Sequence, residues 1–207
     1  MSLAAKLAEG VAQLGLTLPP QAGQRLLEYL ALLQKWNRIY NLTAVREPSK
    51  MVSQHLLDCL AVVPHVKAAT VLDVGSGAGL PGIPLALALP RAHVTLVESS
   101  HKKAAFLQQA KLELQLVNVA VACERVEQWQ PGRTFEMVIS RALSDLAEFT
   151  RLAGRHVAPG GVLAAMKGIY PHEEAAQLPA GWRLREAIAL TVPGLRAQRH
   201  LLLIERE

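Results

Sequence analysis

The glycine-rich segment from Asp73 to Gly82 is the part of the sequence best suited to bind a small molecule. An apolar run ends there in Gly75, Gly77 and Gly79, and glycines let a backbone bend sharply and approach a ligand closely. A helix should follow, and free N–H groups at its start would suit a carboxylate or a phosphate. A tight turn without a ligand is the alternative. The spacing favours a ligand site between a strand and a helix.

A carboxylate, Glu98, ends the next apolar run along the chain. A carboxylate in this position can accept hydrogen bonds from both hydroxyls of an adenosine ribose. S-adenosylmethionine and NAD both contain that ribose. Glu98 therefore predicts an adenosine ligand without choosing between the two, and a solvated strand end is the alternative.

Residues 77–82 match G-x-G-x-x-G, the fingerprint of dinucleotide-binding proteins, but this match is weak when it stands alone. Three features count against NAD. The expected strand ends at Gly75, so the match starts too late. Asp73 lies inside the strand, where methyltransferases carry an acidic residue near the amino group of their ligand. Pro81 and Pro84 disturb the helix start on which a pyrophosphate would lie. S-adenosylmethionine is favoured, and an NAD-dependent oxidoreductase stays the alternative.

The segment Ser140-Arg141-Ala142 follows the fourth expected strand. Methyltransferases that act on amino groups carry Asn or Asp followed by Pro-Pro and an aromatic residue there, and cytosine-C5 enzymes carry Pro-Cys. At this position the chain has neither a cysteine nucleophile nor an amide side chain. Arg141 could donate hydrogen bonds to a base oxygen, hold a phosphate or contact a cofactor carboxylate, and a structural ion pair is the alternative.

Further polar candidates lie outside the glycine-rich segment. Lys167, after the fifth expected strand, and the late Arg199 are cations suited to RNA phosphate, although each could be a solvated surface charge. His55 and Asp58 stand three residues apart and should share one helix face. They predict either a buried hydrogen-bonded pair or a contribution to a base pocket.

From residue 70 onward, apolar runs alternate with helical patterns at Ile83–Leu89, Lys102–Leu116 and Asp145–His156. Strands that alternate with helices predict a parallel sheet covered on both faces. The last two strands have no helix between them, so they should pair antiparallel, as in the methyltransferase variant of this architecture. The expected strands are Thr70–Val74, His93–Val97, Val117–Ala122, Phe135–Ile139, Gly161–Met166, Trp182–Thr191 and Gln198–Glu205.

The chain has 207 residues, of which 51% are hydrophobic, and a net charge of +5. We expect residues 1–64 to form a helical extension packed on one domain at residues 65–207. The basic balance fits a polyanionic partner. Apolar runs are too short to span a membrane and the start lacks a signal-peptide pattern, which predicts a cytoplasmic protein. Cys59 and Cys123 lie in apolar segments and are expected to be buried thiols.

Several segments together resemble the RsmG, or GidB, family of small-subunit ribosomal RNA methyltransferases over nearly the whole chain. The extended loop from Gly75 to Pro84, which reads GSGAGLPGIP, is the most specific of them. The others are Trp36-Asn37-x-x-Tyr40-Asn41-Leu42-Thr43-Ala44, His55-x-x-Asp58, Arg125-Val126-Glu127, Ser140-Arg141-Ala142, Lys167-Gly168 and Arg199-His200.

The resemblance implies a Rossmann-like class I methyltransferase fold, with a mostly parallel seven-stranded sheet, an antiparallel C-terminal hairpin and an N-terminal helical extension. It implies methyl transfer from S-adenosylmethionine to N7 of a guanine, usually numbered 527, in the 530 loop of 16S rRNA. The partner would be 16S rRNA or the 30S subunit. A non-catalytic RNA-binding assembly factor on the same fold is a further alternative. We expect a monomer without a metal.

The resemblance assigns Gly75, Leu80, Val126, Glu127 and Arg141 by matching position, and the other expected roles rest on the residues themselves. Arg141 and Lys167 are the expected catalytic residues, and His55, Lys167 and Arg199 the expected RNA contacts. Because guanine N7 carries a lone pair and no proton, no general base is needed, and alignment with electrostatics can suffice. The expected cofactor-binding residues are Asp73, Gly75, Gly77, Gly79, Leu80, Glu98, Val126, Glu127 and Arg141. Of these, Val126 and Glu127 should lie along the adenine, and Arg141 should stand at the mouth of the site.

Overall fold

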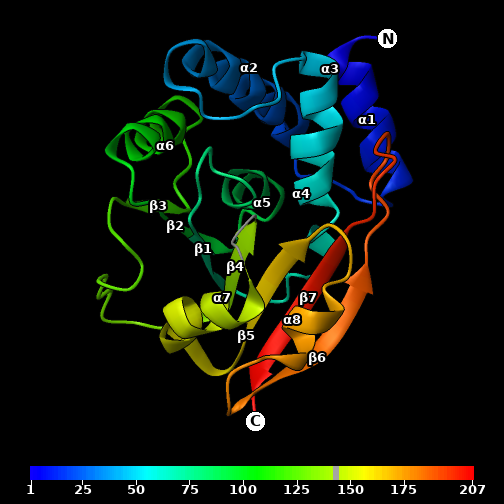
Figure 1. Ribbon diagram of the computed structural model, residues 1–207. Helices are drawn as coiled ribbons and strands as arrows, with labels where there is room; N and C mark the ends of the chain where they lie inside the picture. Colours follow the sequence, from blue (N-terminus) through cyan, green and yellow to red (C-terminus); the bar gives the residue numbers. More distant parts are fainter. Residues whose placement is uncertain (142–144) are drawn as a thin grey trace.

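The computed structural model describes residues 1–141 and 145–207, arranged around a seven-stranded sheet of order β3-β2-β1-β4-β5-β7-β6 (Figure 1). β1 to β5 are parallel, and β7 pairs antiparallel with β5 and β6. This arrangement confirms the expected parallel sheet with a C-terminal hairpin. The strands are β1 (Thr70–Val74), β2 (His93–Val97), β3 (Val119–Ala122), β4 (Phe135–Arg141), β5 (Val157–Lys167), β6 (Trp182–Ala189) and β7 (His200–Arg206).

β5 is the strand that differs most from its expected bounds, because it begins at Val157 rather than at Gly161. The expected strand left out residues 157–160. In the structure Gly160 takes a φ of +74° and the strand continues through it. The register with β4 is irregular around the same place, between Phe135 and Met137. The strand therefore contains a bulge and is longer than expected.

The helices between the strands lie close to their expected positions. They are α5 (Gly82–Ala88), α6 (His101–Glu113) and α7 (Leu146–Ala153). α6 stops three residues before the expected end at Leu116, since Gln115 takes a left-handed φ of +49°. α7 gives way to a 3-10 turn, η3 (Gly154–His156), and the short α8 (His172–Ala176) between β5 and β6 was not expected. Ala142, part of the Ser140-Arg141-Ala142 segment, lies outside the described residues.

The first third of the chain is helical, as expected. It contains α1 (Leu3–Gln13), α2 (Ala22–Tyr40), α3 (Pro48–Met51), a π-helical segment η1 (Val52–Leu57), α4 (Asp58–Leu60) and a 3-10 turn η2 (Val63–His65). Leu26, Leu33 and Leu57 of these helices belong to the same hydrophobic cluster as Val71 and Leu96 of the sheet. A boundary at residue 64 stays a prediction, because the hydrophobic cluster runs across it.

Helices lie on both faces of the sheet (Figure 1), and alternating side chains of its strands belong to two different hydrophobic clusters. On β1, Val71 packs under the N-terminal helices with α5 and α6, whereas Leu72 packs on the side of α7. Asp73 therefore points to the same side as Val71, toward α5.

Within residues 1–141 and 145–207, no helix has the length and apolarity needed to cross a membrane.

Candidate functional site

The glycine-rich loop joins β1 to α5 in a left-handed course, with φ values of +65° at Gly75, +56° at Gly77 and +88° at Gly79. Most of its N–H groups donate hydrogen bonds within the protein. The expectation of free donors at the start of the helix is therefore wrong for these groups. The pairs are Gly75 and Ser76 N–H to the Val97 carbonyl, Gly77 N–H to Glu98, Gly79 and Leu80 N–H to the Ser76 carbonyl, and Gly82 N–H to Asp73.

The glycines of the loop are needed for different reasons. A Cβ added at Gly79 would lie 2.5 Å from Ile83 Cδ1 and 3.0 Å from Leu107, so Gly79 allows close packing of α5 and α6. A Cβ at Gly82 would collide with Leu96 and the Asp73 carboxylate. A Cβ at Gly75 would meet nothing within 4 Å. Gly75 therefore borders open space at the carboxyl edge of the sheet, where a ligand can approach the backbone.

Two buried carboxylates flank this loop. Asp73 is 0% exposed, and its Oδ2 accepts a hydrogen bond from Gly82 N–H at 2.9 Å. Its Oδ1 is buried without a hydrogen-bond partner among the described residues. Burial raises the pKa of Asp73 to about 7, although the Gly82 hydrogen bond and Arg141 act in the opposite direction. One oxygen of Asp73 is thus available for a donor that the protein itself does not supply.

The second carboxylate, Glu98, closes the loop from the side of β2. Its Oε2 accepts from Gly77 N–H and its Oε1 from Ser100 N–H, both at 2.8 Å. The side chain is 6% exposed, so Glu98 is not the solvated strand end considered as an alternative. Each carboxylate oxygen can accept a second hydrogen bond. Glu98 can therefore hold the loop and bind hydroxyl groups at the same time.

Arg141, at the end of β4, belongs to a charged cluster centred on Asp58. Its Nη1 donates to Asp58 Oδ2 at 3.1 Å and to the carbonyl of Gln54 at 3.0 Å, whereas Arg199 Nε donates to Asp58 Oδ1 at 2.9 Å. The Asp58 side chain is 4% exposed, and those of Arg141 and Arg199 are 23% and 27% exposed. Arg141 thus forms the structural ion pair that the sequence offered as an alternative to a functional role. The same ion pair fixes the orientation of its guanidinium group.

His55 does not pair with Asp58, and that prediction is wrong. Its Nε2 lies 2.9 Å from Thr43 Oγ1, while its Nδ1 is buried without a hydrogen-bond partner among the described residues. The π-helical course of η1 places the two side chains differently from the α-helix that the spacing assumed. Burial, together with the charge of Arg141, lowers the pKa of His55 to about 4. The imidazole is therefore neutral near pH 7.

Lys167, at the end of β5, forms an ion pair with Glu174 of α8 at 2.7 Å. Glu174 also accepts from Leu146 N–H at 2.9 Å, so the pair connects β5, α7 and α8. Val126 is buried, and its carbonyl oxygen accepts from Arg155 and lies 3.1 Å from His156 Nε2. Glu127 is exposed.

The exposure of Cys123 was predicted wrongly, and the contact of Tyr29 with the glycine loop was not predicted. Cys59 is buried as expected, whereas Cys123 is exposed with its Sγ 3.2 Å from His101 Nδ1. Tyr29 of α2 reaches the glycine loop, where its hydroxyl donates to the Ala78 carbonyl at 2.6 Å. Helical spacing indicated only that α2 has a buried face, so the sequence carried no signal for this contact. In the described part of the chain, no cluster of three or more His, Cys, Asp or Glu suits a metal.

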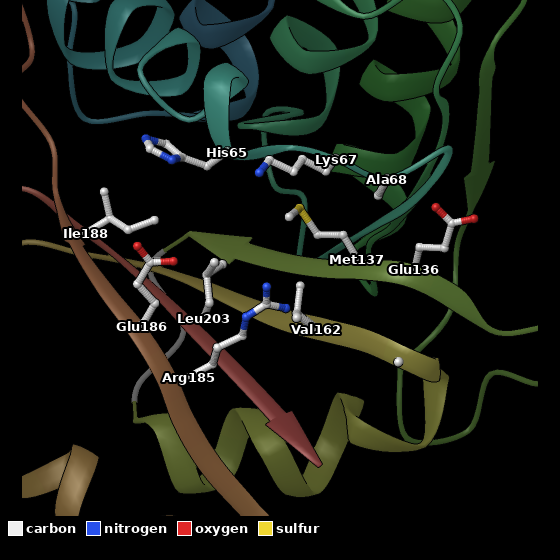
Figure 2. A pocket seen from close by; sticks show the side chains of 11 residues that line it. His65, Lys67, Ala68, Glu136, Met137, Val162, Arg185, Glu186, Ile188 and Leu203 are labelled. Atoms are coloured by element: carbon white, nitrogen blue, oxygen red, sulfur yellow. The ribbon is translucent and has the colours of Figure 1, made fainter. Parts of the chain in front are cut away.

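A separate cavity of about 250 Å³ opens at the opposite, amino edge of β1 and β4 (Figure 2). Its floor contains Met137, Val162 and Leu203, and Lys67 and Arg185 line its rim. The glycine loop and the Asp58 cluster lie at the carboxyl ends of the strands instead. The cavity is therefore distinct from the candidate site. Variants of its cations, Lys67 and Arg185, can serve as controls for variants of the cations at the candidate site.

A model of the GidB family, described as rRNA small subunit methyltransferase G, matches residues 22–202. A ribosomal RNA small subunit methyltransferase G from Nitrosospira multiformis is 56% identical and covers 100% of this chain and 99% of its own length. Its counterpart from Aromatoleum aromaticum is 54% identical, covering 98% and 99%. The structure of the mitomycin 7-O-methyltransferase MmcR shares the fold, with a TM-score of 0.64, 16% identity and coverage of 100% and 72%.

The lowered pKa of His55 predicts a loss of stability in mild acid. An unfolded histidine takes up a proton near pH 6.5, whereas folded His55 does so near pH 4, so the unfolded state is favoured progressively as the pH falls through this window. Over that window the wild type should lose about 3 kcal/mol more than His55→Gln, measured by urea unfolding. His93→Gln, at an exposed position, should follow the wild type. Parallel curves of unfolding free energy against pH for wild type and His55→Gln would contradict the lowered pKa of His55.

Proposed function

Because the chain belongs to the rRNA small subunit methyltransferase G family, we propose that it methylates N7 of a guanine in 16S rRNA. Family membership makes the chain an S-adenosylmethionine-dependent methyltransferase of small-subunit rRNA and excludes the NAD-dependent oxidoreductase. The proposal adds the atom, N7, and the position, the guanine usually numbered 527 in the 530 loop. It also adds the residues that perform the reaction, a monomeric state and a cytoplasmic location.

The observation that carries the cofactor assignment is an open glycine loop between two buried carboxylates. The unpartnered Oδ1 of Asp73 suits the ammonium group of S-adenosylmethionine, because a buried acceptor without a donor is costly. The open side of Gly75 would receive the methionine part, and Glu98 the ribose hydroxyls. We assign Gly77, Gly79 and Leu80 to the shape and wall of this site, and Val126 with Glu127 to the adenine.

Methyl transfer to N7 makes few demands on the protein. The cofactor supplies an activated methyl group, and N7 supplies a lone pair without losing a proton. The residues of the chain need to align the two partners and exclude water. A pKa near 4 makes His55 a weak base, which agrees with a reaction that requires none.

Arg141 and Lys167 are the proposed cations of the reaction site. Two hydrogen bonds fix Nη1 of Arg141, and its partly exposed guanidinium can donate to guanine O6, to a phosphate or to the cofactor carboxylate. Lys167 is held by Glu174 at the end of the neighbouring β5. We propose that Lys167 and Arg199 contact RNA phosphate and that the buried His55 contributes to the base pocket.

The reaction and its position can be tested together by mass mapping of 16S rRNA. Cells that lack the chain should lose one methyl group in the 530 loop, and re-expression should restore it. Purified protein with S-adenosylmethionine should add the same group to 30S subunits from those cells. The modified base should undergo the strand cleavage specific to 7-methylguanine. A methyl group at another base atom would reject N7. Binding without methylation would instead favour the non-catalytic assembly factor.

The open side of Gly75 predicts that even a small side chain there impairs cofactor binding. Gly75→Ala should weaken S-adenosylhomocysteine by at least tenfold in calorimetry, because the methyl group enters the proposed methionine space. Gly132→Ala is a matched control, since Gly132 has a φ of +68°, is exposed and also has nothing within 4 Å. Both variants carry a similar backbone strain of about 1 kcal/mol. Equal affinities for the two variants would remove Gly75 from the site.

The raised pKa of Asp73 predicts that cofactor binding releases a proton. In the free protein Asp73 titrates near pH 7, with Arg141, Glu98 and Ser76 as the neighbours that affect it. An ammonium group beside Oδ1 lowers that pKa, so binding below about pH 7 should expel the proton. Calorimetry of S-adenosylhomocysteine at pH 6.5 in buffers of different ionisation enthalpy measures the number released.

Asp73→Asn is the control for this proton release, because its side-chain oxygen can still accept from Gly82 N–H. It should bind more weakly and release no proton. Without ligand it should be more stable than the wild type above pH 7, since a raised carboxyl pKa means that stability falls as the pH rises from about 4 through about 7. Equal proton release by wild type and Asp73→Asn would reject the role of Asp73.

A further inference from the structure

Tyr29 connects the N-terminal helices to the glycine loop through one buried hydrogen bond. It lies in α2, its side chain is 0% exposed, and its hydroxyl donates to the carbonyl of Ala78 at 2.6 Å across 49 residues of sequence. Its ring centroid lies 6.4 Å from that of Phe106 in α6. Burial raises the pKa of Tyr29 well above its usual value, so the hydroxyl keeps its proton and donates throughout the working range of pH.

The acceptor of this hydrogen bond occupies a critical place in the loop. Ala78 lies between Gly77, whose N–H is bound by Glu98, and Gly79, whose N–H donates to the Ser76 carbonyl at 2.7 Å. The peptide between Ala78 and Gly79 is therefore held at its carbonyl by Tyr29 and at its N–H by the loop. Glycines populate many backbone conformations at similar cost, so the course of this loop has to be fixed by such outside contacts.

We propose that Tyr29 is a positioning residue for the cofactor: it holds the glycine loop in the conformation that binds S-adenosylmethionine. This inference rests on the proposed function, in which the loop receives that cofactor. It makes α2 a part of the cofactor site although no residue of α2 lies in the loop. Asp73 holds the loop at its α5 end, Glu98 holds it from β2, and Tyr29 holds it from the N-terminal helices.

A purely structural role is the competing explanation, because a buried tyrosine hydroxyl can stabilise a fold without affecting a ligand. The two explanations differ in what they predict for ligand binding. If Tyr29 favours the binding-competent loop, its loss lowers affinity through a smaller competent population, and saturating cofactor restores the rate of transfer. If Tyr29 is only structural, the free energy of unfolding falls and the affinity of the folded protein stays unchanged.

The test compares Tyr29→Phe with Thr150→Val. Phenylalanine keeps the ring against Phe106 and removes only the hydroxyl. Thr150 is a matched control on the opposite layer, because its buried hydroxyl also donates to a backbone carbonyl, that of Leu146, at 2.7 Å. Calorimetry should show that Tyr29→Phe binds S-adenosylhomocysteine about tenfold more weakly, whereas Thr150→Val binds like the wild type. Single-turnover methylation of 30S subunits by Tyr29→Phe should approach the wild-type rate at saturating S-adenosylmethionine.

Hydrogen exchange of the wild type gives a second measurement that needs no variant. Coupling between two sites is reciprocal, so S-adenosylhomocysteine should slow amide exchange in α2 around Tyr29 as well as in the loop. Affinity within twofold of wild type for folded Tyr29→Phe would overturn the inference. If that variant does not fold, unchanged exchange in α2 upon binding would overturn it instead. A wild type that fails to bind S-adenosylhomocysteine would reject the proposed cofactor site itself.

Discussion

The tight turn between β1 and α5 is the constraint on which the rest of the site depends. α5 approaches the sheet so closely at Gly82 that a single added carbon would collide with Leu96 and Asp73. This approach buries Asp73 completely, and one hydrogen bond from Gly82 N–H compensates only one of its oxygens. The remaining oxygen is a buried acceptor without a partner among the described residues. The close approach at Gly82 thus explains both the burial of Asp73 and the oxygen that a ligand donor could satisfy.

The charged cluster around Asp58 joins three distant parts of the chain. Asp58 of the N-terminal helices binds Arg141 of β4, 83 residues away, and Arg199 before β7, 141 residues away. A buried carboxylate that holds two arginines satisfies both of its oxygens, so the desolvation of the charge is offset by charge-assisted hydrogen bonds. The N-terminal helices therefore contact the carboxyl edge of the sheet in two places, through Tyr29 at the glycine loop and through Asp58 at Arg141 and Arg199.

The polar groups around this edge are suited to holding partners in place rather than to moving protons. His55 is neutral, and its Nε2 lies beside Thr43 Oγ1, so it offers neither charge nor an accessible base. Lys167 and Arg141 are each held by a carboxylate, which fixes where their positive charge lies. For the proposed transfer, in which no proton has to leave the base, fixed hydrogen-bond donors and a fixed loop can act by aligning the two partners.

Features that depend on neighbouring residues could be predicted from the sequence. Alternation of apolar runs and helical patterns placed the strands within a few residues, and the glycines with Asp73 and Glu98 marked the carboxyl edge, because backbone conformation and strand ends are set locally. Contacts between distant side chains could not be predicted in this way. The π-helical course of η1 separates His55 from Asp58, α8 brings Glu174 to Lys167, and the packing of α2 brings Tyr29 to Ala78. These contacts depend on the orientation of whole elements, which residue spacing does not encode.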